Sequence, residues 1–191
     1  MNSNELRSIL CQAIQKTFKT GAYACDQLNN VKSDQFAIIV NSDDSNHAAM
    51  HWLAIFKERN HDIEFFDSFG MSISFYSPHI KLFLKKFGKR IVQNRHQIQS
   101  NFSNTCGNFC VYYLLHRVRG WSMTSILKDF TLQNLYLNDE KVYLFVKLNF
   151  TQDYYTNSNL KRTENVDEES RDESLCSSQS CKSFKHTCKC T

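Results

Sequence analysis

Proline is almost missing from this sequence, and no part of it is apolar over a length that could cross a membrane. The 191 residues include one proline and 15 phenylalanines, whereas a membrane-spanning helix needs about 18 or more consecutive apolar residues. The opening stretch, MNSNELRSILCQAIQKTF, is amphipathic and lacks the compact apolar block of a secretory signal. These absences exclude a membrane span and lead us to expect reduced thiols in an intracellular compartment.

The composition is otherwise that of a globular protein. Hydrophobic residues make up 41% and charged residues 22%, which is enough apolar material for one domain with its own core. The net charge is +4, with an excess of basic residues in residues 1–150 and a slight excess of acidic residues in 151–191, and the densest basic stretch is KLFLKKFGKRIVQNR at 81–95. This stretch is either the solvated face of a helix or a contact for DNA or another polyanion.

The composition changes near residue 151. Residues 1–150 are predicted to form the only folded domain, and residues 151–191 a polar, disordered tail, because they offer too little apolar surface to offset the entropy of ordering. The irregular spacing of the tail cysteines does not match a zinc finger. We interpret the tail as a flexible segment with exposed thiols. The alternatives are a redox or virion-crosslinking role and, ranked below it, binding of a metal or of a cofactor site on the domain. These thiols are Cys176, Cys181, Cys188 and Cys190.

The spacing of apolar residues predicts an α+β fold. Helical periodicity occurs first near the N-terminus and then mainly in the second half of the domain, whereas short β-rich runs lie between. The predicted helices are 5–18, 79–87, 107–118, 122–130 and 139–149, and the predicted strands are 36–40, 51–57, 62–66 and 90–93. The polar residues between the second and third strands are typical of a hairpin turn.

Two cysteines four residues apart, Cys106 and Cys110, stand where a polar stretch turns into an apolar helix. A thiol at a helix N-terminus has a lowered pKa and is a good nucleophile, and Cys106 holds that position. Zinc is the rival interpretation, but a structural zinc site usually has four ligands, and Cys11 and Cys25 form no second matched pair. Cys110 lies on the apolar face of the helix, which predicts a buried core thiol.

A thiol nucleophile needs a base, and His51 is the best candidate among the seven histidines. It opens the apolar run HWLAIFK and is followed by Trp52. His116 lies ten residues along the helix of Cys106, about 15 Å at 1.5 Å per residue, which is too far for a hydrogen bond to the thiol. The other histidines of the predicted domain stand in polar turns or near charged residues, where surface histidines are common.

The base in turn needs a group that orients it, and Asp67 is placed to do so. Asp67 ends the run DIEFFD and precedes Ser68-Phe69-Gly70. Because His51 begins one predicted strand and Asp67 ends the next, a hairpin brings both to the same edge of a sheet. An acid at that edge can bind the far imidazole nitrogen and fix its tautomer. Alone, Asp67 would be a turn residue before a glycine.

Together these residues resemble the adenovirus-type cysteine endopeptidases, the adenain family, which shares a clan with the ubiquitin-like-protein proteases. The resemblance rests on His51-Trp52, on the Asp67-Ser68-Phe69-Gly70 turn, and on the C-G-x-F-C motif at 106–110. The early segment Gly21–Asp26 is also similar to the family, and the resemblance covers about residues 20–148. The C-G-x-F-C form is similar to adenain rather than to the SUMO proteases.

The resemblance implies an adenain-like, papain-like fold with a central, mainly antiparallel sheet flanked by helices. It also implies that Cys106 is the nucleophile, His51 the base and Asp67 the orienting acid, in place of the longer glutamate of adenain. Gln99, seven residues before Cys106, takes the place of the oxyanion-binding glutamine. Gln97 and Gln93 lie nearby as alternatives for that role.

Trp52 and Gly107 are predicted to contact the substrate. Trp52 would cover the imidazole and narrow the cleft, although a tryptophan in a strand is commonly a core residue. Gly107 has no Cβ and would let the backbone pass close to a substrate. Family members cleave after Gly-Gly or Gly-x sequences preceded by an apolar residue, so the resemblance implies such sites here.

The first functional hypothesis is a cysteine endopeptidase that cleaves viral or mobile-element capsid or core precursors during virion maturation, as a monomer in the virion and host nucleus. The second is an isopeptidase for SUMO or another ubiquitin-like modifier with the same catalytic residues. The third is a non-enzymatic DNA- or capsid-binding protein. No cofactor or metal is predicted for the chemistry. The resemblance implies activation by DNA, for which 81–95 is the candidate, and by a disulfide-linked peptide, for which Cys11 and Cys25 are candidate thiols.

Overall fold

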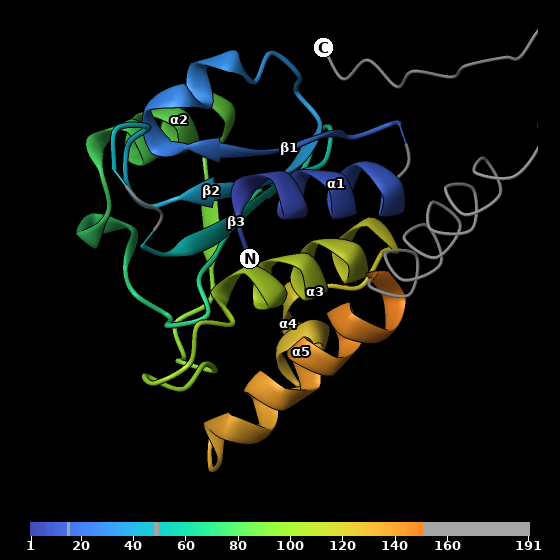
Figure 1. Ribbon diagram of the computed structural model, residues 1–191. Coiled ribbons are helices and arrows are strands. Elements are labelled where there is room, and N and C mark those ends of the chain that lie inside the picture. The colour runs from blue at the N-terminus through green and yellow to red at the C-terminus, as the bar shows by residue number, and fades with distance from the viewer. Residues whose placement is uncertain (15, 48–49, 151–191) are drawn as a thin grey trace, which may run out of the picture. The chain divides into compact units, whose positions relative to one another are not determined.

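The computed structural model describes residues 1–14, 16–47 and 50–150 (Figure 1). In this part of the chain, helices surround one five-stranded sheet. The strands are β1 (Lys19–Ala24), β2 (Phe36–Asn41), β3 (Trp52–Lys57), β4 (Ile63–Phe66) and β5 (Ile91–Gln93). The α-helices are α1 (Ser3–Ala13), α2 (Pro78–Phe87), α3 (Cys106–Val118), α4 (Met123–Leu127) and α5 (Leu135–Phe150), and two 3₁₀ helices are η1 (Cys25–Asn30) and η2 (Ile73–Phe75).

The sheet is mixed, with the strands in the order β1-β2-β3-β4-β5. The central strands β2, β3 and β4 pair antiparallel, and the edge strands β1 and β5 pair parallel to their neighbours. The predicted α+β class is therefore confirmed. The predicted antiparallel arrangement holds for the centre of the sheet. The edge pairs are parallel because a crossover through η1 joins β1 to β2, and one through η2 and α2 joins β4 to β5.

Apolar side chains on both faces of the sheet account for its burial. Every residue of β2 and β3 is buried. On one face, small residues such as Ala37 and Ala54 pack with Leu6 of α1 and Phe109 of α3. On the other face, Phe36, Ile38, Leu53 and Phe65 pack with η1 and with Ile80 and Leu84 of α2. Helices thus cover both faces, with α3 lying between the sheet and α5 (Figure 1).

Local sequence determines where several elements begin and end. Asn2, rather than Ser3 or Asn4, caps α1 and forms a capping box with Glu5. Pro78 begins α2 directly after its cap, Ser77. The predicted hairpin joins β3 to β4, and Asn60 in its turn has φ 66°. The structure adds β1 and η1, which periodicity did not predict because the segment is short and only partly apolar.

The ends of several elements meet at one edge of the sheet. His51 directly precedes β3, Asp67 directly follows β4, and Cys106 begins α3. No helix in the described ranges is long and apolar enough to cross a membrane. The predictions for residues 151–191, including the four tail cysteines, fall outside the part of the chain that the structure describes.

Candidate active site

The β3–β4 hairpin brings His51 and Asp67 into contact. The strands pair Ala54 with Phe66, so the residues just before β3 face those just after β4. His51 Nε2 lies 2.6 Å from Asp67 Oδ1. The Asp67 side chain is fully buried and that of His51 is 12% exposed. The pairing predicted from the sequence is thus present, and it leaves the other imidazole nitrogen for a second partner.

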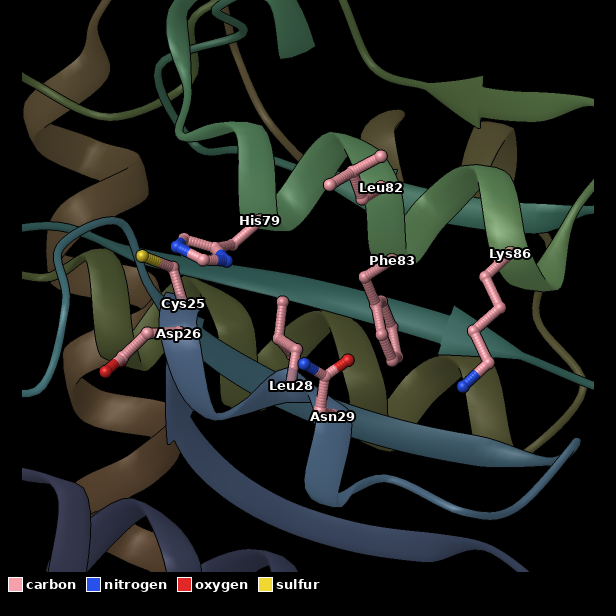
Figure 2. Close-up of a pocket in the computed structure, with 8 residues that line it drawn as sticks. All are labelled: Cys25, Asp26, Leu28, Asn29, His79, Leu82, Phe83 and Lys86. Atoms are coloured by element: carbon pink, nitrogen blue, oxygen red, sulfur yellow. The ribbon is translucent and has the colours of Figure 1, made fainter.

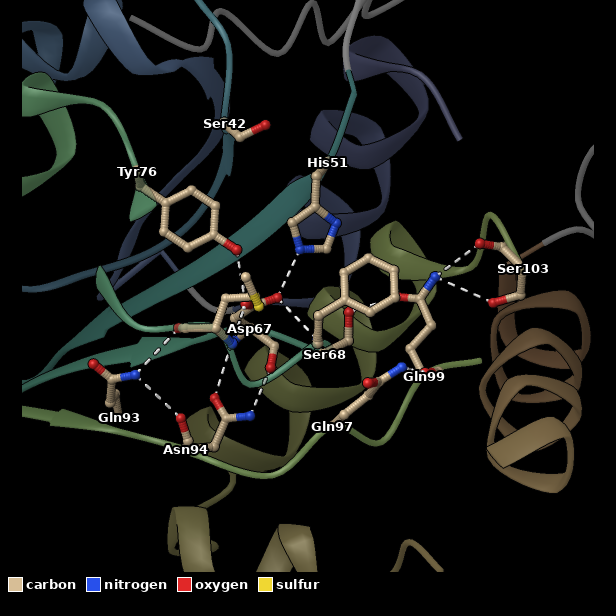
Figure 3. A network of polar contacts seen from close by, with 12 residues as sticks. Ser42, His51, Asp67, Ser68, Tyr76, Gln93, Asn94, Gln97, Gln99 and Ser103 are labelled. Atoms are coloured by element: carbon tan, nitrogen blue, oxygen red, sulfur yellow. Dashed lines mark hydrogen bonds and ion pairs between the residues drawn. The ribbon is translucent and has the colours of Figure 1, made fainter. Parts of the chain in front are cut away.

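Four donors surround the Asp67 carboxylate (Figure 3). Besides His51, Oδ1 accepts the Phe69 N–H at 3.0 Å. Oδ2 accepts the Met71 N–H at 2.8 Å and the Tyr76 hydroxyl at 2.7 Å. Burial raises the pKa of the Asp67 carboxyl, but the bonds from His51, Tyr76 and Phe69 outweigh burial, and its pKa is lowered. Asp67 is therefore an anion of fixed orientation.

Cys106 is the first residue of α3 and is 8% exposed. Burial raises the pKa of its thiol, but hydrogen bonds from His51 and from the backbone N–H groups of Trp52 and Gly107 lower it by more. The thiolate therefore forms at a lower pH than in an exposed cysteine. This environment matches the predicted nucleophile.

His51 lies between Asp67 and Cys106. Burial lowers the pKa of its imidazole, but the hydrogen bonds and charges of Asp67 and Cys106 raise it to about 9. The Phe69 ring lies 4.8 Å from the imidazole, centroid to centroid, and the Tyr76 ring 6.4 Å away. The lowered thiol pKa and the raised imidazole pKa both shift this pair toward the thiolate–imidazolium state.

The turn that carries Asp67 is fastened to the segment 94–99. The buried amide of Asn94 accepts the Asp67 N–H at 2.9 Å and donates to the Asp67 carbonyl oxygen at 2.6 Å. The Ser68 carbonyl oxygen accepts the N–H groups of Ile98 and Gln99. Gly70 has φ +65°, and a Cβ there would lie 2.6 Å from the His96 carbonyl carbon. Glycine thus allows the turn and the segment to approach this closely.

Gln99 is buried beside this turn, and its side chain has partners at both ends. Its Oε1 accepts the Ser68 hydroxyl at 2.6 Å. Its Nε2 donates to the Ser103 carbonyl oxygen at 3.0 Å and to the Ser103 hydroxyl at 3.1 Å. Figure 3 shows this amide nitrogen directed toward Ser103, on the side away from His51. The structure thus brings His51, Asp67 and Cys106 together in one row, with Gln99 in the adjoining loop.

The two predicted substrate contacts, Trp52 and Gly107, make extensive contacts within the domain. Trp52 is 5% exposed, and its indole N–H donates to the Met1 carbonyl oxygen at 3.1 Å. A Cβ on Gly107 would lie 3.4–3.5 Å from side-chain atoms of Met1, Leu6 and Trp52. These distances are ordinary van der Waals contacts, so the packing of α1 and β3 against the start of α3 does not itself require glycine at 107.

The remaining thiols have other environments. Cys110 is fully buried, as predicted, and burial raises its pKa. Burial also raises the pKa of Cys25, which lines a cavity of about 130 Å³ between η1 and α2, where His79 and Lys86 also lie (Figure 2). Cys11 is exposed. Among the described residues, no group of three or more His, Cys, Asp or Glu side chains is arranged to hold a metal ion.

Sequence reasoning did not identify Asn94, Tyr76 or Asp139 as site residues. Asn94 and Tyr76 bind Asp67, and Asp139 of α5 accepts a hydrogen bond from Thr105, the residue before Cys106. None of the three belongs to a motif or stands at a spacing that carries chemistry. Only the packing of distant segments reveals their contacts.

Comparisons with known proteins identify the family of this chain. A family model described as adenovirus endoprotease matches residues 25–165. An uncharacterized protein of Sputnik virophage, V9, is 32% identical over 82 residues, an alignment that covers 34% of this chain and 47% of that protein. This match thus spans about half the length of the curated relative. Among solved structures, the central domain of an uncharacterized Legionella pneumophila protein, Lpg1148, has a TM-score of 0.43 and 14% identity, covering 75% of this chain and 97% of that domain.

Proposed function

Because this chain belongs to the adenovirus endoprotease family, we propose that it is a cysteine endopeptidase with Cys106 as nucleophile, His51 as base and Asp67 as the residue that orients His51. The observation that carries the proposal is the hydrogen-bonded row from Asp67 through His51 to the Cys106 thiol at the start of α3. A carboxylate, an imidazole and a thiol in this order are what cysteine-based acyl transfer needs.

The reaction begins from the thiolate–imidazolium pair. The Cys106 thiolate attacks the carbonyl carbon of the scissile peptide, and the π electrons of that carbonyl move to its oxygen. When the tetrahedral adduct collapses, the C–N bond breaks and the His51 imidazolium gives its proton to the departing amine. His51 then removes a proton from water, which attacks the thioester. The second tetrahedral adduct collapses with cleavage of its C–S bond, which releases the carboxylic acid product and restores the Cys106 thiolate beside the His51 imidazolium.

The oxyanion formed in each step needs donors. We assign this role to the backbone N–H of Cys106 and to the side-chain amide of Gln99, each typically worth about 3 kcal/mol in the transition state. Because the Gln99 Nε2 donates to Ser103, this assignment requires the amide to exchange one of those bonds for the oxyanion. Trp52 and Gly107, which flank Cys106 in the structure, remain the residues that we propose to contact the substrate.

The proposed substrates are capsid or core precursor proteins cleaved after Gly-Gly or Gly-x, in virion maturation. The family match and the likeness to a virophage protein support a viral setting. In that setting the enzyme acts in the virion and the host nucleus. Activation by DNA through residues 81–95, or by a peptide disulfide-linked to Cys11 or Cys25, belongs to the same proposal.

The test is cleavage of a Leu-x-Gly-Gly reporter peptide by the purified full chain in reducing buffer, with and without DNA. Cys106→Ala should abolish turnover. Cys110→Ala is the matched control, because it removes a buried thiol from the same helix without touching His51. Turnover that persists in Cys106→Ala would refute the assignment of the nucleophile.

The same assay separates the alternatives. Cleavage of a folded SUMO-type fusion in preference to the short peptide would favour the isopeptidase. No turnover in any protein, together with no selective alkylation of Cys106 near neutral pH, would reject the thiolate and favour a DNA- or capsid-binding role.

A further inference from the structure

A buried carboxylate from α5 reaches the loop that leads into α3. Asp139 is 7% exposed. Its Oδ1 accepts the Thr105 hydroxyl at 2.9 Å, and its two oxygens accept the Ser100 N–H at 3.4 and 3.3 Å. None of the ion pairs found among the described residues includes Asp139. Burying a carboxylate is costly unless hydrogen bonds compensate it, and within the part of the chain that the structure describes its hydrogen-bond donors lie in this one loop.

Thr105 occupies the N-cap position of α3 but does not cap the helix. A threonine at this position commonly accepts a hydrogen bond from an N–H two or three residues on, with an extended backbone. Elsewhere in this chain Asn2 and Ser122 do so, with ψ 172° and 154°. Thr105 has ψ 9° and makes no side-chain cap bond. Its hydroxyl donates to Asp139 and lies 3.0 Å from the Ser103 hydroxyl, so these partners hold the side chain turned toward α5 and the loop.

The ψ angle of Thr105 rotates the peptide bond between Thr105 and Cys106, and so decides where the Cys106 N–H points. Within the described ranges, no hydrogen bond from this N–H to a protein acceptor is found. Asp139 also holds Ser100, the residue after Gln99. The carboxylate therefore anchors the loop at both ends, beside each of the two proposed oxyanion donors.

We propose that Asp139 is a positioning residue of the protease. It keeps Thr105 in its non-capping conformation and so aims the Cys106 N–H at the substrate oxyanion. This inference rests on the function proposed above. In this proposal Asp139 touches neither the thiol nor the substrate. Its replacement should therefore slow only those steps in which an oxyanion forms.

The experiment compares Asp139→Asn, Asp139→Ala and the double variant Asp139→Ala/Thr105→Val with the wild-type chain. Glu140→Gln is the matched control, since it alters the neighbouring, exposed carboxylate of α5. For each protein we would measure kcat and KM with the reporter peptide and the rate at which iodoacetamide alkylates Cys106. Alkylation depends on the thiolate but forms no oxyanion. Thermal unfolding would confirm that each variant is folded.

Asp139→Ala should lower kcat by about tenfold or more. This is part of the roughly 10²–10³-fold fall in kcat that follows complete loss of one oxyanion donor. KM and the alkylation rate should stay within about twofold of wild type, as should every parameter of Glu140→Gln. Adding Thr105→Val should restore part of kcat, because valine has no hydroxyl with which to cap α3. Asp139→Asn retains an acceptor for Thr105 and should give a smaller loss, which keeps the test valid if the alanine variant does not fold.

An unchanged kcat in the folded Asp139 variants would overturn the inference while leaving the protease assignment intact. Parallel losses of kcat and alkylation rate, or a double variant no better than the single one, would also overturn it, because these indicate damage to the thiolate or to the fold. A wild-type chain with no Cys106-dependent turnover would instead reject the proposed function, and this inference with it.

Discussion

The protonation states of His51 and Cys106 determine the pH range of the proposed protease. The two groups share a hydrogen bond and titrate as a coupled pair. The pKa of the Cys106 thiol is lowered, so the thiolate forms at a lower pH than that of an ordinary cysteine. The imidazole pKa is raised to about 9, so the proton needed by the leaving amine is lost only as the pH rises through that value. We therefore expect kcat/KM to be maximal between these limits and to fall with a midpoint near pH 9.

The measurement is kcat/KM against pH at constant ionic strength, with thiolate absorbance near 240 nm as a second readout. Asp67→Asn removes the main group that raises the imidazole pKa, so it should move the alkaline limb to lower pH and reduce the maximum. Asp62→Asn is the control, because Asp62 is an exposed residue paired with Arg90. An alkaline limb that stays in place in Asp67→Asn would contradict the assigned role of the carboxylate.

At the scale of elements, a partly buried ion pair between Glu64 and Arg117 connects β4 with α3. The strand β4 leads to Asp67, and α3 begins with Cys106. Glu64 of β4 accepts hydrogen bonds from Arg117 Nε at 2.6 Å and Nη2 at 3.0 Å, and also from the Tyr113 hydroxyl. The Arg117 and Glu64 side chains are 12% and 14% exposed. The Arg117 guanidinium also lies 4.5 Å from the centre of the Phe56 ring of β3. This contact fixes α3 on the sheet about three turns after Cys106.

Arg117→Ala should lower the free energy of unfolding by about 2–3 kcal/mol, because it leaves a largely buried carboxylate without its cation and removes packing from Phe56. Urea unfolding measures the change. Arg59→Ala is the matched control: its pair with Asp34 is exposed, with side chains 67% and 64% accessible, so its loss should cost less than about 1 kcal/mol. Equal destabilisation by the two variants would mean that burial of the Glu64 pair adds nothing.

At the scale of the whole molecule, the elements that the sequence predicted are those with a strong local pattern. The β3–β4 hairpin and α3 follow from apolar runs and a polar turn, and they suffice to place His51, Asp67 and Cys106. The family indicated by their motifs is confirmed by the match over residues 25–165. The start of α5 was predicted four residues late, because Leu135–Asn138 lack the periodicity of the rest of the helix.

The contacts that support the catalytic residues could not be predicted in the same way. Asn94 is 27 positions from Asp67, and Asp139 is 34 positions from Thr105. Asparagine and aspartate are ordinary surface residues in sequence, and only the packing of the whole domain buries these two against the site. The hydrogen bonds of Gln99 to Ser68 and Ser103 depend on the same packing, so a spacing of seven residues could indicate its role but not its orientation.

The basic stretch 81–95 gives a prediction that involves the charge of the whole domain. It runs from α2 to β5, and its exposed cations include Lys85, Lys86 and Lys89. If these cations contact phosphates, binding releases counterions and the affinity falls steeply with salt. A Lys85→Glu/Lys89→Glu variant should bind duplex DNA more weakly and reduce the slope of log K against log salt by about 2. Peptide turnover without DNA should stay unchanged.

The measurement is DNA binding by fluorescence anisotropy at several salt concentrations. Arg119→Glu/Lys128→Glu changes the net charge by the same amount at two other exposed positions. If long-range attraction by net charge alone governed binding, both double variants would lose the same affinity. A larger loss and a smaller slope for the 85/89 variant alone would identify the stretch as the contact surface. Equal losses would assign DNA binding to overall charge, and the activation proposed through residues 81–95 would then have no local site.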